Sequence, residues 1–386
     1  MFVAALLSLP ATTASGPATP TLRDHPVASP APPVYLDGGW STQHYLKGQP
    51  AGEPMPATVP GDILTDLQRV GRQPDPYYNS TWREPSFIAA WNEGTWEYRK
   101  TFATPTPTAE AHLLVFDGVR MGAMLALNGK ALGNATDQFM RYIFDVGELL
   151  HKQEGQENTL TVTFGDSLLI DCGGRYTYSS EIDWAPTMLT KDSANGSEPD
   201  PSRPHRSTFG FGIWKSVYVL PVPAAAPVIT QLVSHTYYAG GHPTSALTDS
   251  NHKGFRLEAT VELLAPTAGQ SGQVTVWGDW PGAKQVSATL SAMPAGVSNA
   301  TVVIDASQTL GAKLWQPHGH GAQNLYKLQA TFTPTGGAVT AATSRNIGFR
   351  HVALVTVNDT DAQENAAHGQ ANGNGQFTMF FRVNVR

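Results

Sequence analysis

The chain has 386 residues, enough for two or three domains at roughly 150 residues each. Its formal net charge is −6, and no cluster of Lys and Arg stands out, which argues against nucleic acid or an anionic membrane as a partner. Charged residues make up only 15%, while Gly and Pro number 37 and 29, a balance that favours short strands joined by turns. An all-β fold is therefore expected, and the sequence predicts no cofactor.

The N-terminus predicts an exported protein. Residues 2–9 (FVAALLSL) form a short apolar run that small residues follow, as in a secretory signal peptide. Residues 15–33 are rich in Pro, Ala and Ser without periodicity, so we assign residues 1–33 to a signal peptide and a disordered leader. Asn-X-Ser/Thr sequons fit a secretory or lysosomal route. There are five of them, at Asn79, Asn134, Asn195, Asn299 and Asn358.

A first β domain is expected over residues 34–222. Residues 57–71 (ATVPGDILTDLQRVG) contain the one helical pattern, with apolar positions on one face and Gly71 at its end. Strand patterns follow, and Asn128-Gly129 between apolar flanks predicts a tight hairpin. Residues 171–210 lose periodicity and predict a long loop. Further strands are expected in the sequences TWEYRKTF, HLLVFDGV, NTLTVTFG and GIWKSVYVLPV.

A second β domain is expected over residues 223–357, after a linker at residues 221–227 (PVPAAAP). Seven short strand patterns spaced by turns indicate an immunoglobulin-like sandwich, here without a disulfide because Cys172 is the only cysteine. The seventh pattern is GFRHVALVTV, at residues 348–357. Residues 358–386 are polar at first and end in one more strand, QFTMFFRVNVR.

The sequence EIDWAP, at residues 181–186, places a carboxylate beside a large aromatic. An aromatic face can pack on the C–H face of a pyranose while the carboxylate accepts hydrogen bonds from its hydroxyls. The alternative is an ordinary strand end, since Pro cannot continue a ladder. The residues alone leave both interpretations open.

Several motifs, in this order, resemble the non-catalytic half of the β-mannosidases in the β-galactosidase-like glycoside hydrolase family. VPGDILTDL, PDPYY and WEYRKTF resemble the start of the family's sugar-binding jelly-roll. FDGV, LNG and the run FMRYIFDV resemble its middle, and GIWKSVYV its last strand. LWQPHGHGAQNLYKL and RNIGFRHVALV are similar to the end of its immunoglobulin-like domain. The resemblance implies a galactose-binding-like jelly-roll followed by an immunoglobulin-like sandwich.

The resemblance also implies a substrate site. In the family, a Trp-Asp-Trp-Gly-Pro segment holds the terminal mannose, and residues 183–186 match its last four positions with Ala for Gly, while Ile182 replaces the first Trp. We therefore predict that Asp183 and Trp184 contact a mannoside or related glycan. Tyr77 and Tyr78, in the PDPYY loop, are predicted to line the rim of the same pocket, with core packing as the alternative.

Other residues carry weaker predictions. His318 and His320 have metal-like spacing but no nearby third ligand, so a loop is expected and no metal. Cys172 lacks a catalytic partner pattern and is expected to be inert. Glu97 and Arg99 alternate with aromatics, which predicts an exposed ladder on a strand.

No catalytic residue is expected in this chain. Retaining glycosidases need two Glu, which in this family lie on a (β/α)₈ barrel. Residues 376–386 resemble the hairpin that leads into that barrel. We therefore expect a fragment of a β-mannosidase whose partner is the catalytic barrel of the same polypeptide, inactive on its own. The alternative is a standalone two-sandwich module that binds carbohydrate or protein.

Overall fold

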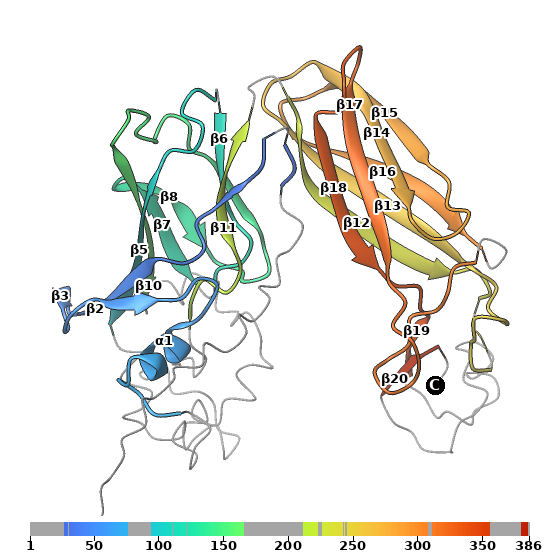
Figure 1. Cartoon of the computed structure of the whole chain (residues 1–386), viewed down its shortest axis with the longest axis horizontal. Helices are drawn as coiled ribbons and strands as arrows, with labels where there is room; N and C mark the ends of the chain where they lie inside the picture. The colour runs from blue at the N-terminus through green and yellow to red at the C-terminus, as the bar shows by residue number, and fades with distance from the viewer. Residues whose placement is uncertain are drawn as a thin grey trace, which may run out of the picture.

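The computed structural model describes residues 27–29, 31–75, 94–109, 111–120, 122–165, 211–222, 226–241, 243, 245–307, 311–355 and 380–384. Within these residues the secondary structure is antiparallel β-sheet apart from a single short helix, which confirms the all-β prediction. Figure 1 shows two lobes, each built from two sheets, joined where β11 ends and β12 begins. No helix among the described segments has the length and hydropathy to span a bilayer.

The first lobe contains a four-stranded sheet, in the order β1-β11-β6-β9, and a seven-stranded sheet, in the order β3-β2-β5-β10-β7-β8 with β4 beside β2. The strands of this lobe are β1 (Val34–Tyr35), β2 (Trp40–Leu46), β3 (Gln49–Pro50), β4 (Met55–Ala57), β5 (Thr95–Ala103), β6 (Ala111–Phe116), β7 (Ala123–Leu127), β8 (Lys130–Ala135), β9 (Tyr142–Asp145), β10 (Glu157–Gly165) and β11 (Val217–Val222). The helix is α1 (Ile63–Arg69).

Local sequence explains these elements. Asn128 and Gly129 have φ of 51° and 76°, the left-handed conformation that a tight turn between β7 and β8 needs, so the predicted hairpin is confirmed. Asp62 caps α1 by accepting a hydrogen bond from the amide of Thr65 at 3.0 Å, and Gly71 follows the helix with φ of 73°.

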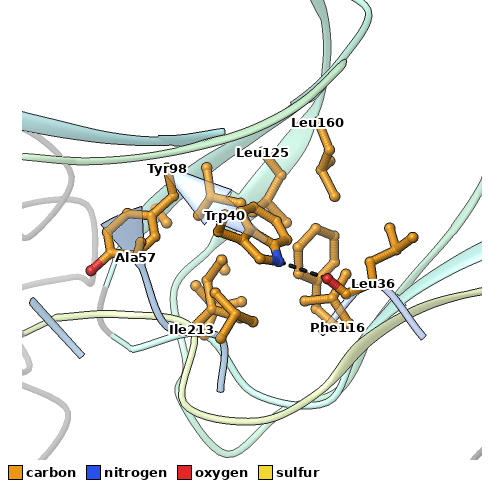
Figure 2. Packing of buried hydrophobic residues seen from close by; sticks show 14 of the residues in the cluster. Leu36, Trp40, Ala57, Tyr98, Phe116, Leu125, Leu160 and Ile213 are labelled. Carbon is orange, nitrogen blue, oxygen red and sulfur yellow. Dashed lines mark hydrogen bonds between the residues drawn. The ribbon is translucent and has the colours of Figure 1, made fainter. Parts of the chain in front are cut away.

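The core of the first lobe lies between its two sheets. Trp40 lies near its centre, and its indole nitrogen donates to the carbonyl of Leu36 at 2.8 Å (Figure 2). Phe116, Leu125 and Ile213 lie around the ring and are fully buried or nearly so. A buried indole N–H needs an acceptor, and the carbonyl supplies it without opening the core to water.

The second lobe pairs a three-stranded sheet, β12-β13-β16, with a four-stranded sheet, β15-β14-β17-β18. In β13, buried apolar side chains from Phe255 to Leu263 alternate with polar ones that are exposed or half-buried, as expected for a strand with one face in the core. The strands are β12 (Val228–Tyr238), β13 (Phe255–Ala265), β14 (Gln270–Gly278), β15 (Val286–Met293), β16 (Gly296–Ala306), β17 (Tyr326–Pro334) and β18 (Ala341–Ile347).

The seventh strand of this sandwich differs from the prediction. It is β18, whose sequence AATSRNI buries only its two ends, Ala341 and Ile347, because the strand lies at the end of its sheet. The predicted strand GFRHVALVTV instead supplies β19 (Val352–Val355), which pairs with β20 (Phe380–Val383) outside both sheets. A mostly polar strand at a sheet end lacks the apolar alternation on which strand prediction depends.

An apolar seam joins the two lobes. The outer face of the four-stranded sheet packs against Val228 and Leu264 of the second lobe, so all six residues of β11 are buried. Pro221 and Val222 belong to this strand, and the predicted linker is wrong for those two residues. Proline is tolerated there because Pro221 lies beyond the point where β1 pairs with β11.

The leader also enters this seam. Ala28 exchanges two backbone hydrogen bonds with Ile229, at 2.9 and 3.1 Å, and the amide of Val27 donates to the Tyr218 hydroxyl at 2.9 Å. Val27 is fully buried. The prediction of disorder is therefore wrong for residues 27–29, because the apolar pair Val27-Ala28 covers sheet surface that would otherwise face water.

Candidate carbohydrate-binding site

The four predicted sugar-contact residues lie in two segments outside the described residues. Tyr77 and Tyr78 belong to residues 76–93, and Asp183 and Trp184 belong to residues 166–210. The described residues that flank these segments are neighbours: Thr95, at the start of β5, pairs with Gly165, at the end of β10. Both segments therefore join the seven-stranded sheet at the same end of the same pair of strands.

Residues 211–213, which follow residues 166–210, pack near the same end of β10. The ring of Phe211 stacks on Phe164 of β10, with centroids 4.9 Å apart and planes 14° apart. The backbone of residues 211–213 pairs with the turn before α1, since Ile63 N donates to Phe211 O and Gly61 N to Ile213 O, both at 2.9 Å. The end of β10, the turn before α1 and residues 211–213 thus form one hydrogen-bonded and packed base.

Glycine is required where these backbones cross. A Cβ on Gly212 would lie 2.5 Å from the carbonyl oxygen of Gly61 and 2.7 Å from the Cα of Asp62. Backbone atoms cannot move aside as a flexible side chain can, so this approach fixes how closely residues 211–213 lie to the helix.

The carboxylates described near this base already have structural partners. Asp62 accepts from the amide and hydroxyl of Thr65, at 3.0 and 2.8 Å. Asp66 is buried and accepts from the amide of Thr58, at 3.0 and 3.1 Å, and from Arg69 at 2.9 Å. Burial raises the pKa of the Asp66 carboxyl above its ordinary value, while the Thr58 hydrogen bonds and Arg69 act in the opposite direction. Neither carboxylate is placed to bind a sugar.

Tyr98 lies beneath the same region. Its side chain is fully buried, and its hydroxyl points away from Trp40 (Figure 2). Among the described residues this hydroxyl has no hydrogen-bond partner. Burial, followed by the negative charges of Asp66 and Asp62, raises the pKa of Tyr98 well above its ordinary value, so the hydroxyl stays protonated and available as a donor.

The weaker candidates have structural roles where they are described. Glu97 and Arg99 form a 2.6 Å ion pair on β5, where Arg99 is exposed as predicted and Glu97 is half-buried. His318 and His320 are exposed in a turn that the backbone bond from His320 N to Pro317 O closes at 3.0 Å. The part of the chain that the structure describes holds no group of three or more potential metal ligands. Cys172 lies outside it.

A cavity of about 340 Å³ lies beside the seam, between the two lobes. Its lining is aliphatic apart from Asp145, whose Oδ1 accepts from the amide of Gly147 at 3.0 Å. A sugar presents many hydroxyls that need partners, so this lining does not fit one.

A buried polar network crosses the seam, and the sequence did not predict it. Arg141 donates from Nε to Asp117 at 2.7 Å and from a terminal nitrogen to the carbonyl of Thr230, on β12, at 2.5 Å. The side chains of Arg141 and Asp117 are only 9% and 1% exposed. The hydroxyl of Tyr218 also approaches Asp117, at 3.4 Å. The available signal was an arginine inside the apolar run FMRYIFDV, whose partners lie far away in the sequence.

Two family descriptions match the two lobes. Residues 40–195 match "Glycosyl hydrolase 2 galactose-binding domain-like", which suggests carbohydrate binding, and residues 243–350 match "Glycosyl hydrolases family 2". The two lobes are thus a galactose-binding-like domain followed by the immunoglobulin-like domain of family 2. The chain belongs to glycosyl hydrolase family 2, and its two domains are β-mannosidase-like.

Individual relatives agree with this assignment. The chain is 27% identical to β-mannosidase A of Aspergillus aculeatus over 330 residues, covering 80% of this chain and 33% of that protein. It is 25% identical to the β-mannosidase of Rattus norvegicus over 337 residues, covering 84% and 35%. The fold matches the crystal structure of a β-D-mannosidase from Dictyoglomus thermophilum with a TM-score of 0.59 and 21% identity, over 92% of this chain and 39% of that one. The chain thus spans about a third of the length of the curated relatives that it matches.

Proposed function

We propose that the chain is the non-catalytic N-terminal portion of a β-mannosidase-like glycoside hydrolase. With the catalytic barrel of the same polypeptide attached, the enzyme hydrolyses terminal β-D-mannose residues of glycans, and without the barrel the chain has no hydrolytic activity. One observation carries this proposal: both lobes match family 2, in order, and the curated relatives cited above are named β-mannosidases. The proposal places the protein in the secretory pathway, on the basis of the apolar residues 2–9 and the sequons.

In this proposal the jelly-roll supplies one flank of the sugar pocket. Asp183 and Trp184 contact the mannoside, and Tyr77 and Tyr78 line the rim. The pairing of Thr95 with Gly165 supports this arrangement, because it anchors both segments at one end of one sheet. A carboxylate that accepts hydrogen bonds from sugar hydroxyls distinguishes a sugar from its deoxy analogue, because the analogue leaves the carboxylate unpaired.

The test is calorimetry of the purified chain with mannose and β-mannobiose, and with galactose as the comparison sugar. Mannoside binding that Asp183→Ala abolishes supports the proposed contact. The matched control is Glu97→Gln, which removes the half-buried carboxylate of the ladder on β5 and is expected to leave binding unchanged. Equal binding by wild type and Asp183→Ala would show that this residue does not reach the sugar.

The transcript downstream of the Arg386 codon separates the proposed enzyme from a standalone binding module. A continuing frame that encodes a barrel with two catalytic Glu supports the enzyme. A stop codon with no barrel-encoding sequence in any frame would instead favour the module, and a glycan array would then identify its ligand.

A further inference from the structure

Two of the five sequons lie among the described residues, and both occupy strands at the end of a sheet. Asn134 lies on β8, the last strand of the seven-stranded sheet, and Asn299 lies on β16, the last strand of the three-stranded sheet. Strands in such positions expose backbone groups and can pair with another chain, so proteins usually protect them.

The side chains of the two sequon asparagines face solvent, as attachment of a glycan requires. Asn134 and Asn299 are exposed, whereas the middle residue of each sequon, Ala135 or Ala300, is buried in a core. Successive side chains of a strand face opposite sides, so each asparagine faces solvent while its neighbour packs inward. A glycan on either amide would extend into water without disturbing the core.

Exposed apolar side chains lie beside both asparagines. Asn134 is the direct partner of Met124 on β7, and the Met124 side chain is 48% exposed. Partners across antiparallel strands share a face, so a glycan on Asn134 would cover this methionine. On β16, the alternate positions Val297 and Val303 are 56% and 46% exposed on the same face as Asn299. These are sites where an unprotected end strand would favour association.

We propose that Asn134 and Asn299 are acceptor sites for N-linked glycans, which shield the apolar surface of the two end strands. The bond formed joins the asparagine side-chain nitrogen to the anomeric carbon of a glycan, which a lipid-linked oligosaccharide donates, and the lipid diphosphate leaves. This inference goes beyond the proposed function, since it concerns the outer faces of both sandwiches and no residue of the sugar pocket.

The experiment expresses the full chain in a eukaryotic secretory host, once with its own N-terminus and once behind a heterologous signal peptide. Peptides from the secreted and membrane-bound fractions are deglycosylated enzymatically in ¹⁸O-water, which marks each occupied asparagine as labelled aspartate. Most copies are expected to carry label at Asn134 and Asn299. Asn346 is the internal control, because it is exposed on the end strand β18 but is followed by Ile-Gly and is expected to stay unlabelled.

The outcomes test the two acceptor sites separately from the proposed secretory route. Label at both sites with either leader supports the inference and the secretory route. Label only behind the heterologous leader supports the acceptor sites but overturns the route. No label at either site in the membrane-bound and secreted chains overturns the inference. The variants Asn134→Gln and Asn299→Gln should each remove one glycan and raise the rate of aggregation, and an unchanged aggregation rate would refute the shielding role.

Discussion

The ion pair in the seam predicts a large loss of stability on Arg141→Met. The variant keeps much of the side chain's apolar length but leaves Asp117 without its arginine, in a position where the carboxylate is only 1% exposed. Removing one partner of a buried ion pair typically costs about 3–5 kcal/mol, because the remaining charge stays desolvated. The hydrogen bond to the Thr230 carbonyl, which ties the first lobe to β12, is lost at the same time.

Urea unfolding followed by tryptophan fluorescence measures this effect, and a double variant isolates its cause. Arg141→Met should lower the free energy of unfolding by about 3–5 kcal/mol. Arg141→Met combined with Asp117→Asn should recover a large part of that loss, because the neutral amide needs no counter-charge and still offers an acceptor to Tyr218.

The control is Arg256→Met, which breaks the exposed pair with Glu258, where the nitrogen and oxygen are 3.4 Å apart. Exposed pairs contribute about 0–1 kcal/mol, so this variant should change little. The reasoning is refuted if Arg141→Met is no more destabilising than the control. It is also refuted if the double variant is as unstable as the single one, because the loss would then not come from the carboxylate charge that Arg141 balances.

Three further changes test other parts of the structure. Gly212→Ala should lower stability by about 1–3 kcal/mol in thermal or urea unfolding, since its Cβ would lie 2.5 Å from the carbonyl oxygen of Gly61; a neutral result would contradict this close approach. Burial lowers the pKa of His252 below its ordinary value of 6.5, so the unfolded chain binds the proton more readily. Wild type should therefore lose stability relative to His252→Gln as the pH falls below 6.5, and parallel curves for the two proteins would contradict this reasoning. Asn384→Ala removes three side-chain hydrogen bonds of 2.9 to 3.0 Å from a fully buried site, and hydrogen exchange should then show β19 and β20 losing protection before either sandwich does.

Much of the fold was predictable because its signals are local. The Asn128-Gly129 hairpin and the helix that ends at Gly71 each follow from a few consecutive residues, and the structure confirms both. β18 was missed for the converse reason. It lies at the end of its sheet and buries only Ala341 and Ile347, so its sequence lacks the pattern of a half-buried strand.

The seam could be predicted only in part. Six consecutive apolar residues in β11 indicate a strand that is covered on both faces. In a strand with one solvent-exposed face, apolar residues would alternate with polar ones. Nothing in that run says that Val27 and Val228 cover one face of the strand while the core of the first lobe covers the other. The predicted sugar contacts, Asp183 and Trp184 among them, came from family resemblance and stay predictions, since they lie outside the described residues.

The seam bears on the proposed enzyme because it sets where the jelly-roll lies. A jelly-roll loop that forms one flank of a sugar pocket must keep a fixed position relative to the catalytic barrel. A displacement of about 1 Å is enough to impair such a site. The jelly-roll contacts the immunoglobulin-like domain through an apolar face and through the hydrogen bond that Arg141, held by Asp117, donates to the Thr230 carbonyl. The β-bridge between Ala28 and Ile229 adds a further contact at the seam. In a full-length enzyme, Arg141→Met should therefore raise KM for mannosides while the catalytic barrel stays folded. Unchanged kinetics in a variant that is measurably less stable would show that the orientation of the jelly-roll does not depend on this contact.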